Sequence, residues 1–251
     1  MRTGQLLVNI ITTSGSESES LCEEEFRDLI LGLALNSSVC GVLHTIDDDV
    51  ADATVCNELR VLWGVPYYEE EILDLKFKVG AFSFFQSNVC AAERLYKDAI
   101  SLVENSEGKV VFDLYCGTGT ISQAIARSCK EVYGVEIVEE AVEAARESAK
   151  QNGLENCHFI AGDVLKVLDN IEQKPDVIIV DPPRSGIHPK AWDKILSYGV
   201  SQIVYVSCNP KTLTVNLKAC PEHGYKIEQI KAYDNFSFTE HTECICLLSK
   251  I

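Results

Sequence analysis

A regular alternation of strand-like and helix-like segments begins after Lys109, and it constrains the fold more than any other feature of this chain. Five short runs rich in β-branched residues are separated by segments with helical periodicity. The runs span 110–115, 131–136, 158–161, 177–181 and 203–207. Strands that alternate with helices predict a mostly parallel sheet covered by helices on both faces.

Two helices and the last two strands complete this expectation. A helix is predicted over 138–151, where apolar residues recur on one face and Gly153 is placed to end it. Another helix, predicted over 88–104, leads into the main domain. Residues 225–233 and 244–248 are successive strand-like runs with no helix between them, which predicts an antiparallel hairpin at the sheet edge.

The first part of the chain has a different pattern. Apolar runs at 6–11, 39–43 and 73–79 are combined with one helix-like stretch at 23–35, which is typical of a small α+β unit. A chain of 251 residues can hold one full α/β core and a small appended domain. We therefore predict an α+β subdomain over 1–79 and an α/β domain over 80–251.

Cysteine usage and hydropathy indicate the class of protein. The eleven cysteines are odd in number and form no CxxC pair, so we expect reduced thiols. Seven are expected to be small buried hydrophobes: Cys22, Cys40, Cys56, Cys90, Cys129, Cys157 and Cys220. The apolar stretches fall short of the roughly 20 residues that span a bilayer. We expect a soluble intracellular protein without membrane contact, in the cytoplasm or alternatively in the nucleus.

The net charge of −16 argues against a broadly basic surface for nucleic acid. Its distribution is uneven, because residues 1–74 hold fifteen acidic side chains against three basic ones. Between 182 and 219 the balance is reversed, with five basic residues and a single acid, Asp193. Since charges are screened over about 8 Å in cellular salt, a local patch can still attract a polyanion.

The segment DLYCGTGT (113–120) follows a predicted strand and opens a helix. Gly117 and Gly119 let the backbone approach a ligand closely, and Thr120 starts the helix. Glu136 ends the next strand, where a carboxylate suits a ribose diol, and Asp163 follows the third, where an adenine would lie. Glycine turns of this kind also occur for purely structural reasons, but three acids in register favour a ligand site.

The spacing of this loop selects among cofactors. A nicotinamide fingerprint is broken, because Ser122 stands where a third glycine would be needed. Asp113, which opens the loop, suits a positively charged methyl donor better than a pyrophosphate. We therefore predict S-adenosylmethionine as the cofactor.

Two further motifs, DPPRSG (181–186) and SCNP (207–210), end the fourth and fifth strands and should face the same crevice. A rigid Pro-Pro loop suits a flat base. Cys208 alone could be a structural cysteine, but beside this crevice it favours carbon 5 of a pyrimidine as the methyl acceptor. That carbon becomes reactive once a thiolate has added to carbon 6.

The same chemistry needs a base and an ionised thiol. The base must remove the proton from carbon 5, and Glu243 in EHTEC (240–244) is our choice. Arg184 and Lys211 are expected to help ionise the thiol. His241 is either a packed histidine or a supporting substrate contact.

Four motifs in order give the chain a family resemblance: FFQSN (84–88), DLYCGTGT, DPPRSG with SCNP, and HTE (241–243). From about residue 73 to the end, the sequence resembles the RNA uracil-5 methyltransferases that act on tRNA or ribosomal RNA. The resemblance implies a Rossmann-like class I methyltransferase fold of the α/β class. It also implies methyl transfer from S-adenosylmethionine to carbon 5 of a uridine, through a covalent cysteine adduct at carbon 6.

The resemblance assigns roles residue by residue. It makes Cys208 the nucleophile and Glu243 the base, and it places Phe84 near a base flipped out of an RNA loop. Arg184 and His241 are expected to contact substrate. The expected cofactor contacts, from the loop and the resemblance together, are Gln86, Asp113, Tyr115, Gly117, Gly119, Thr120, Glu136, Asp163 and Asp181.

The sequence also departs from the family. The separate RNA-binding β-barrel and the four-cysteine iron-sulfur cluster of some members are not seen, so we expect no cluster and an RNA affinity supplied by another domain or a partner. SFTEHTE (237–243) lacks the proline common before the histidine, which affects local loop geometry. Three alternatives remain: a methyltransferase for cytosine or a base nitrogen, a cofactor-binding scaffold with weak turnover, and a role of residues 1–72 in docking a basic partner.

Overall fold

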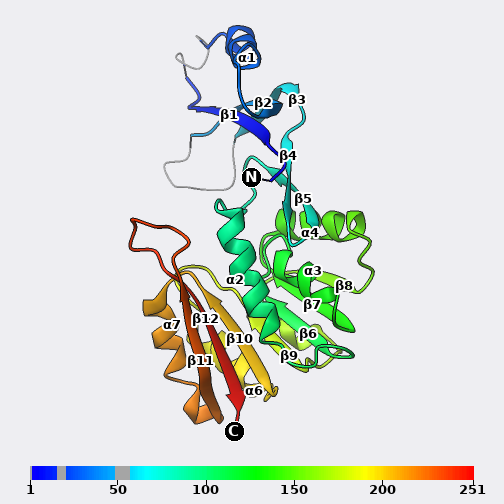
Figure 1. Ribbon diagram of the computed structural model, residues 1–251, viewed down its shortest axis with the longest axis vertical. Coiled ribbons are helices and arrows are strands. Elements are labelled where there is room, and N and C mark those ends of the chain that lie inside the picture. Colours follow the sequence, from blue (N-terminus) through cyan, green and yellow to red (C-terminus); the bar gives the residue numbers. More distant parts are fainter. Residues whose placement is uncertain (1, 16–20, 49–56) are drawn as a thin grey trace. The chain divides into compact units, whose positions relative to one another are not determined.

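The computed structural model describes residues 2–15, 21–48 and 57–251, so Cys56 lies outside the described residues. The chain forms two compact units, Met1–Phe85 and Gln86–Ile251 (Figure 1). This division falls six residues after Val79, where the sequence placed the boundary. The extent of each domain stays a prediction.

The first unit is an α+β structure, as the sequence predicted. Its main sheet has the order β1 (Gln5–Thr12), β2 (Ser38–Ile46) and β3 (Glu58–Gly64), with β2 parallel to β1 and antiparallel to β3. A hairpin of β4 (Tyr67–Ile72) and β5 (Leu75–Gly80) forms a second sheet.

Three details of this unit differ from the prediction. Helix α1 (Glu23–Leu31) is shorter than the stretch expected at 23–35, because it ends at Gly32. Strand β3 was missed because its residues are almost all exposed, so it lacks a buried apolar face. Strand β4 was missed because its three consecutive glutamates, Glu69–Glu71, hide the apolar period.

The second unit is built on one seven-stranded sheet with the order β11-β12-β10-β9-β6-β7-β8. Its parallel strands are β6 (Val110–Leu114), β7 (Glu131–Glu136), β8 (Cys157–Ala161), β9 (Val177–Val180) and β10 (Gln202–Ser207). The strand order reverses between β6 and β9, and ligands of open α/β sheets bind at the carboxyl ends of the strands at such a point.

The predicted hairpin closes one side of this sheet. Strand β12 (Glu243–Lys250) lies antiparallel between β10 and β11 (Tyr225–Tyr233), so β11 is the edge strand. All four residues of β9 are fully buried. Because neighbouring side chains of a strand point to opposite faces, both faces of the sheet are covered at its centre.

Six helices of the described residues connect or flank these strands. They are α2 (Val89–Ser101), α3 (Thr120–Ala126), α4 (Glu139–Gln151), α5 (Val164–Val167), α6 (Pro189–Ser197) and α7 (Pro210–Leu217). The predicted helices and the five predicted strands are all found, the strands with ends within one residue of expectation. In the part of the chain that the structure covers, no helix has the length and apolarity needed to cross a bilayer.

The cysteines of the described residues are all free thiols, as expected. The prediction that Cys22 and Cys90 are buried is wrong. Cys22 precedes α1, a helix that buries no side chain, and Cys90 lies between the buried Val89 and Ala91 on the outward side of α2. Apolar neighbours in sequence did not imply burial here, because successive residues of a helix point in different directions.

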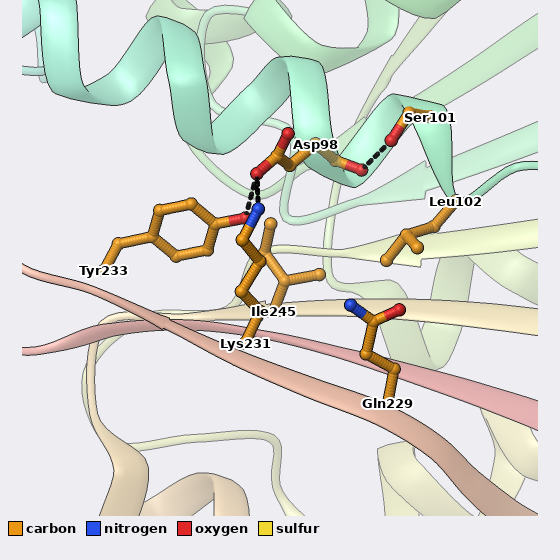
Figure 2. A pocket seen from close by; sticks show the side chains of 7 residues that line it. All are labelled: Asp98, Ser101, Leu102, Gln229, Lys231, Tyr233 and Ile245. Atoms are coloured by element: carbon orange, nitrogen blue, oxygen red, sulfur yellow. Dashed lines mark hydrogen bonds and ion pairs between the residues drawn. The ribbon is translucent and has the colours of Figure 1, made fainter.

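Helix α2 is tied to the hairpin through Asp98. Its carboxylate accepts a hydrogen bond from the Tyr233 hydroxyl (2.6 Å) and forms an ion pair with Lys231, and both partners belong to β11 (Figure 2). These groups occupy a small polar pocket that is also lined by Ser101, Leu102, Gln229 and Ile245.

A buried amide, Asn216 on α7, fixes the end of the DPPRSG segment. Its Oδ1 accepts hydrogen bonds from the Ile187 N–H (3.0 Å) and the Tyr205 hydroxyl (2.9 Å), and its Nδ2 donates to the Ile187 carbonyl (2.8 Å). All three groups are buried, so no water can replace the amide without rearrangement.

We expect Asn216→Ala to lower the free energy of unfolding by about 2–4 kcal/mol, because it leaves several buried polar groups without partners. Tyr205→Phe removes one hydrogen bond and should cost about 1 kcal/mol. Urea titration checks both values, with the exposed Thr214→Ala on the same helix as the control. An Asn216→Ala protein as stable as the Thr214→Ala control would contradict this account.

Candidate active site

The loop after β6 is a tight turn held by backbone hydrogen bonds. The Tyr115 and Cys116 N–H groups donate to the Val135 carbonyl (2.8 and 3.1 Å), and Gly119 N–H donates to Cys116 O (2.8 Å). Gly119 has φ +75°, and a Cβ there would lie 2.6 Å from the Phe159 ring, so only glycine fits. A Cβ on Gly117 would meet nothing within 4 Å, which leaves open space at the turn.

Tyr115 is the strained residue of this loop. Its φ of +65° is unfavourable for a side chain that is not glycine and costs about 1–3 kcal/mol. Burial, followed by the charges of Asp163 and Glu136, raises the pKa of its hydroxyl to about 12. The three predicted cofactor contacts Tyr115, Glu136 and Asp163 therefore lie within electrostatic reach of one another.

Glu136 is fixed in place by backbone donors. Its Oε1 accepts from Ile137 N (2.8 Å) and Val138 N (3.0 Å), and its Oε2 accepts from Gly117 N (3.1 Å). Since a carboxylate oxygen has two lone pairs, Oε2 keeps capacity for a further donor. The exposed Asp163 caps α5 by accepting from Leu165 N (2.8 Å).

Asp113 lies deeper than the sequence suggested. The residue is fully buried, its Oδ2 accepts from the Ser122 hydroxyl (2.5 Å), and its Oδ1 has no hydrogen-bond partner in the structure. Burial raises the pKa of this carboxyl to about 7. Thr120, the first residue of α3, is also buried. Asp113 is therefore a buried charge beneath the glycine loop, with one oxygen available.

A second group of predicted residues meets at the neighbouring strands. Ser207, the last residue of β10, pairs with Cys244 of the antiparallel β12. Cys208 and Glu243 are the next residues beyond this pair, and the charge of Glu243 acts on the Cys208 thiol. Strand β9 pairs with β10 on its other side, and Asp181 follows the last residue of β9. Backbone pairing thus brings together three residues that are far apart in the sequence.

The electrostatics of this group agree with its geometry. Burial, followed by the charges of Glu243 and Asp113, raises the pKa of Asp181 to about 8. Burial also raises the pKa of Glu243, and Arg184 partly offsets this effect. Asp181 can therefore hold and release a proton near neutral pH.

The thiol of Cys208 is not activated in this structure. Burial and the charges of Glu243 and Asp181 raise its pKa, and Arg184 acts in the opposite direction but is outweighed. Arg184 thus has the predicted effect, whereas Lys211 is not among the groups that shift this pKa. The pKa of the thiol is therefore raised and not lowered, because burial, with the two carboxylates added to it, outweighs the help expected from Arg184.

Arg184, in the segment after β9, is hydrogen-bonded both to the segment after β10 and to His241 before β12. Its Nη2 donates to His241 Nδ1 (2.6 Å), and its carbonyl accepts from Asn209 Nδ2 (3.1 Å) and Thr212 Oγ1 (3.3 Å). A guanidinium can only donate, so Nδ1 of His241 must be the unprotonated acceptor. His241 is therefore a partner of Arg184, which favours the supporting role over that of a packed histidine.

Tyr96 joins the site without having been predicted. It is buried on α2, and its hydroxyl accepts a hydrogen bond from Gln86 Nε2 (3.1 Å). Burial and the charges of Asp181, Glu243 and Asp113 raise its pKa well above the usual value. The sequence placed Tyr96 on the apolar face of a helix, and periodicity cannot reveal what its hydroxyl contacts. Ser122 was missed as a partner of Asp113 for a similar reason.

Phe84 belongs to the first unit, apart from the residues above. Its side chain is 78% exposed, and its predicted contact with a flipped base stays a prediction.

The known proteins that this sequence resembles, as given below, are all named as methyltransferases of RNA. A family model described as tRNA (uracil-5-)-methyltransferase matches residues 71–251. A protein named uncharacterized RNA methyltransferase from Clostridium tetani is 48% identical over 243 residues, covering 97% of this chain and 53% of the relative. A protein with a similar name from Caldanaerobacter subterraneus is 45% identical over 249 residues, covering 99% of this chain and 55% of the relative. The chain thus spans about half the length of the curated relatives it matches.

A solved structure extends the comparison to the fold. The tRNA (uracil-54, C5)-methyltransferase of Pyrococcus abyssi, crystallised with S-adenosyl-L-homocysteine, superposes with a TM-score of 0.77 at 27% identity. The match covers 97% of this chain and 56% of the other. The predicted Rossmann-like class I methyltransferase fold is confirmed.

The raised pKa of Asp181 makes stability depend on pH. An aspartate in the unfolded chain titrates near pH 3.9, so between about pH 4 and pH 8 the folded state holds more protons than the unfolded state. Stability contributed by this group therefore falls as pH rises through that window. Asp181→Asn should be more stable than the wild type at pH 8 by at least about 1 kcal/mol and show little advantage at pH 4.

Urea titrations at pH 4, 6 and 8 measure this difference, and the exposed Glu222→Gln serves as the control. If Asp181→Asn and the wild type keep the same difference in stability at all three pH values, the carboxyl is not perturbed by burial.

Proposed function

Because the chain belongs to the tRNA (uracil-5-)-methyltransferase family, we propose that it is the catalytic part of an enzyme that methylates carbon 5 of a uridine in RNA. The observation that carries this proposal is the β10–β12 register, which pairs Ser207 with Cys244 and so brings the adjoining Cys208 within electrostatic reach of Glu243 and of Asp181. A thiol and a carboxyl at one point are the two groups that uracil-5 methylation requires.

The cofactor of this reaction would be S-adenosylmethionine, which supplies an electrophilic methyl group on a sulfonium. The residues of the glycine loop fit such a ligand, because Gly117 leaves open space and Glu136 has a free lone pair beside it. Tyr115, Asp163 and Gln86 would complete the contacts. Asp113 would contribute a carboxyl group beneath the loop, with one oxygen unpartnered in the structure, and a cationic ligand nearby would favour its ionised form.

Cys208 begins the chemistry. Its partly exposed thiol gives its proton to solvent, and Arg184 stabilises the resulting thiolate. The sulfur then bonds to carbon 6 of the uracil, and the electrons of the carbon 5–carbon 6 double bond move toward carbon 5 and the neighbouring carbonyl. Carbon 5 becomes nucleophilic and would take the methyl group, whose bond to the sulfonium sulfur would break and leave S-adenosylhomocysteine, a neutral thioether.

Glu243 completes the cycle by removing the proton that carbon 5 still carries. The electrons of that bond restore the ring double bond, and the bond between sulfur and carbon 6 breaks. Burial raises the pKa of Glu243, which makes its carboxylate a stronger base than one in water. Arg184 acts in the opposite direction and favours the ionised form that accepts the proton.

The cofactor site can be tested separately from catalysis. Glu136→Gln should weaken the binding of S-adenosylhomocysteine by about 10- to 100-fold, the equivalent of losing a hydrogen bond to a charged group. Isothermal titration calorimetry measures the dissociation constant, and the exposed Glu139→Gln on α4 is the matched control. Equal affinity of the two variants would remove Glu136 from the site.

The covalent step can be trapped with RNA that contains 5-fluorouridine, because fluorine at carbon 5 cannot be removed as a proton. We expect mass spectrometry to show a protein–RNA adduct with wild-type protein and S-adenosylmethionine. The adduct should be absent with Cys208→Ala and present with Cys90→Ala, an exposed cysteine on α2. Transfer of the methyl group to cytosine or to a base nitrogen, without an adduct, would overturn the proposal.

The role of Glu243 predicts a different phenotype. With ordinary RNA from cells that lack the modification, Glu243→Gln should release tritium from 5-labelled uridine at least about 100-fold more slowly than wild type, since general base catalysis is worth that much or more. It should also accumulate a methylated covalent adduct. Wild-type protein that binds the cofactor but releases no tritium from any RNA would favour a scaffold instead.

A further inference from the structure

The connection between β11 and β12, residues 234–242, carries an unusually exposed aromatic side chain. Phe238 is 108% exposed, the highest value among the large hydrophobic residues that the structure describes. Its φ is +68°, a conformation that only glycine adopts without cost. The residue therefore has an unfavourable backbone conformation and an apolar ring in water, and among the described residues no contact that compensates for either is found.

The exposure does not come from a loose connection. Asn235 is buried, and its carbonyl accepts from Asn88 Nδ2 at the start of α2 (2.9 Å). The Phe236 carbonyl accepts from both Thr239 N (3.1 Å) and Thr239 Oγ1 (2.7 Å). The turn that displays Phe238 is thus anchored on both sides of its tip.

The turn also belongs to the candidate active site. The Phe236 ring packs edge-on against His241 at 6.5 Å between centroids, and His241 is the hydrogen-bond partner of Arg184. Two residues after His241 comes Glu243, whose charge acts on the Cys208 thiol. A substrate that reaches Cys208 therefore arrives beside the turn that displays Phe238.

The net charge of the chain indicates which kind of RNA contact to expect at this turn. The net charge of −16 argues against a broadly basic surface, so attraction to phosphates is confined to local stretches such as residues 182–219. Stacking of a base on an aromatic ring does not depend on charge and tolerates any base. We propose that Phe238 is a stacking platform for an unpaired RNA base that flanks the target nucleotide. The inference rests on the proposed function, because it assumes an RNA substrate at Cys208.

A binding experiment tests the platform without catalysis. An eight-nucleotide oligouridylate and an abasic strand of the same length are titrated with the full chain, and fluorescence anisotropy gives the dissociation constants. Wild type should prefer the base-bearing strand. Phe238→Ala should weaken binding of that strand by about 5- to 150-fold and leave the abasic strand unchanged. Phe238→Trp should restore the preference.

Two controls sharpen the result. Ile227→Ala removes another exposed apolar side chain, toward the far end of β11, and should bind like wild type. The salt dependence should have the same slope for Phe238→Ala and wild type, because stacking releases no counterions. A changed slope would assign Phe238 to phosphate contacts and overturn the platform, as would wild-type binding that is absent or indifferent to the bases.

Tritium release separates this inference from the proposed function. If wild type releases tritium and Phe238→Ala has an unchanged KM for RNA, the platform is wrong and the proposed function stands. If no protein releases tritium but the oligouridylate preference is lost in Phe238→Ala, the platform stands and the proposed function fails. A rise in KM that exceeds the fall in kcat, restored by Phe238→Trp, supports both.

Discussion

The antiparallel pairing of β12 between β10 and β11 is the constraint on which the candidate site depends. Parallel strands alone bring Asp181 and Cys208 to one edge of the sheet, because β9 and β10 end side by side. The third group arrives only because β12 runs in the opposite direction, so that it starts where β10 ends. A shift of this register by one residue would turn Glu243 to the other face of the sheet. The long hairpin therefore acts as a positioning device for one carboxyl group.

That placement brings buried carboxyl groups close together, and the fold offsets only part of the resulting electrostatic cost. Burial raises the pKa values of Asp113, Asp181 and Glu243, and the charges of Glu243 and Asp113 raise that of Asp181 further. Arg184 is the cation that offsets it, and its hydrogen bond to His241 together with its carbonyl contacts holds it beside both loops. Such a group destabilises the folded state at neutral pH. This electrostatic cost is expected at a site where protons must move, and it explains why Cys208 is not ionised before substrate binds.

The sequence was sufficient for the strands and helices of the second unit because their buried faces impose a clear periodicity. The four apolar residues of β9 and the motifs after β9 and β10 predicted the edge of the sheet where chemistry occurs. The sequence could not decide which of the two last strands pairs with β10, since both are strand-like, and that choice determines whether Glu243 reaches Cys208. It also could not find Tyr96 or Ser122, because apolar periodicity does not show which group a hydroxyl on a buried helix face contacts. In the first unit, β3 and β4 were missed because they bury little apolar surface.

Backbone strain separates structural positions from functional ones in this chain. Of the described non-glycine residues with positive φ, Leu73 and Asp74 form the two-residue turn between β4 and β5, where the twist of a hairpin requires that conformation. Asn105 lies in the connection between α2 and β6, and asparagine adopts a positive φ more readily than most residues. Tyr115 and Phe238 have neither explanation. One lies in the loop that fits a cofactor, and the other in the turn that leads to Glu243. Strained residues of this kind cluster at ligand-binding sites, where the strain is part of the function. Strain in both loops therefore supports a site that extends from the glycine turn to the surface where RNA would be held.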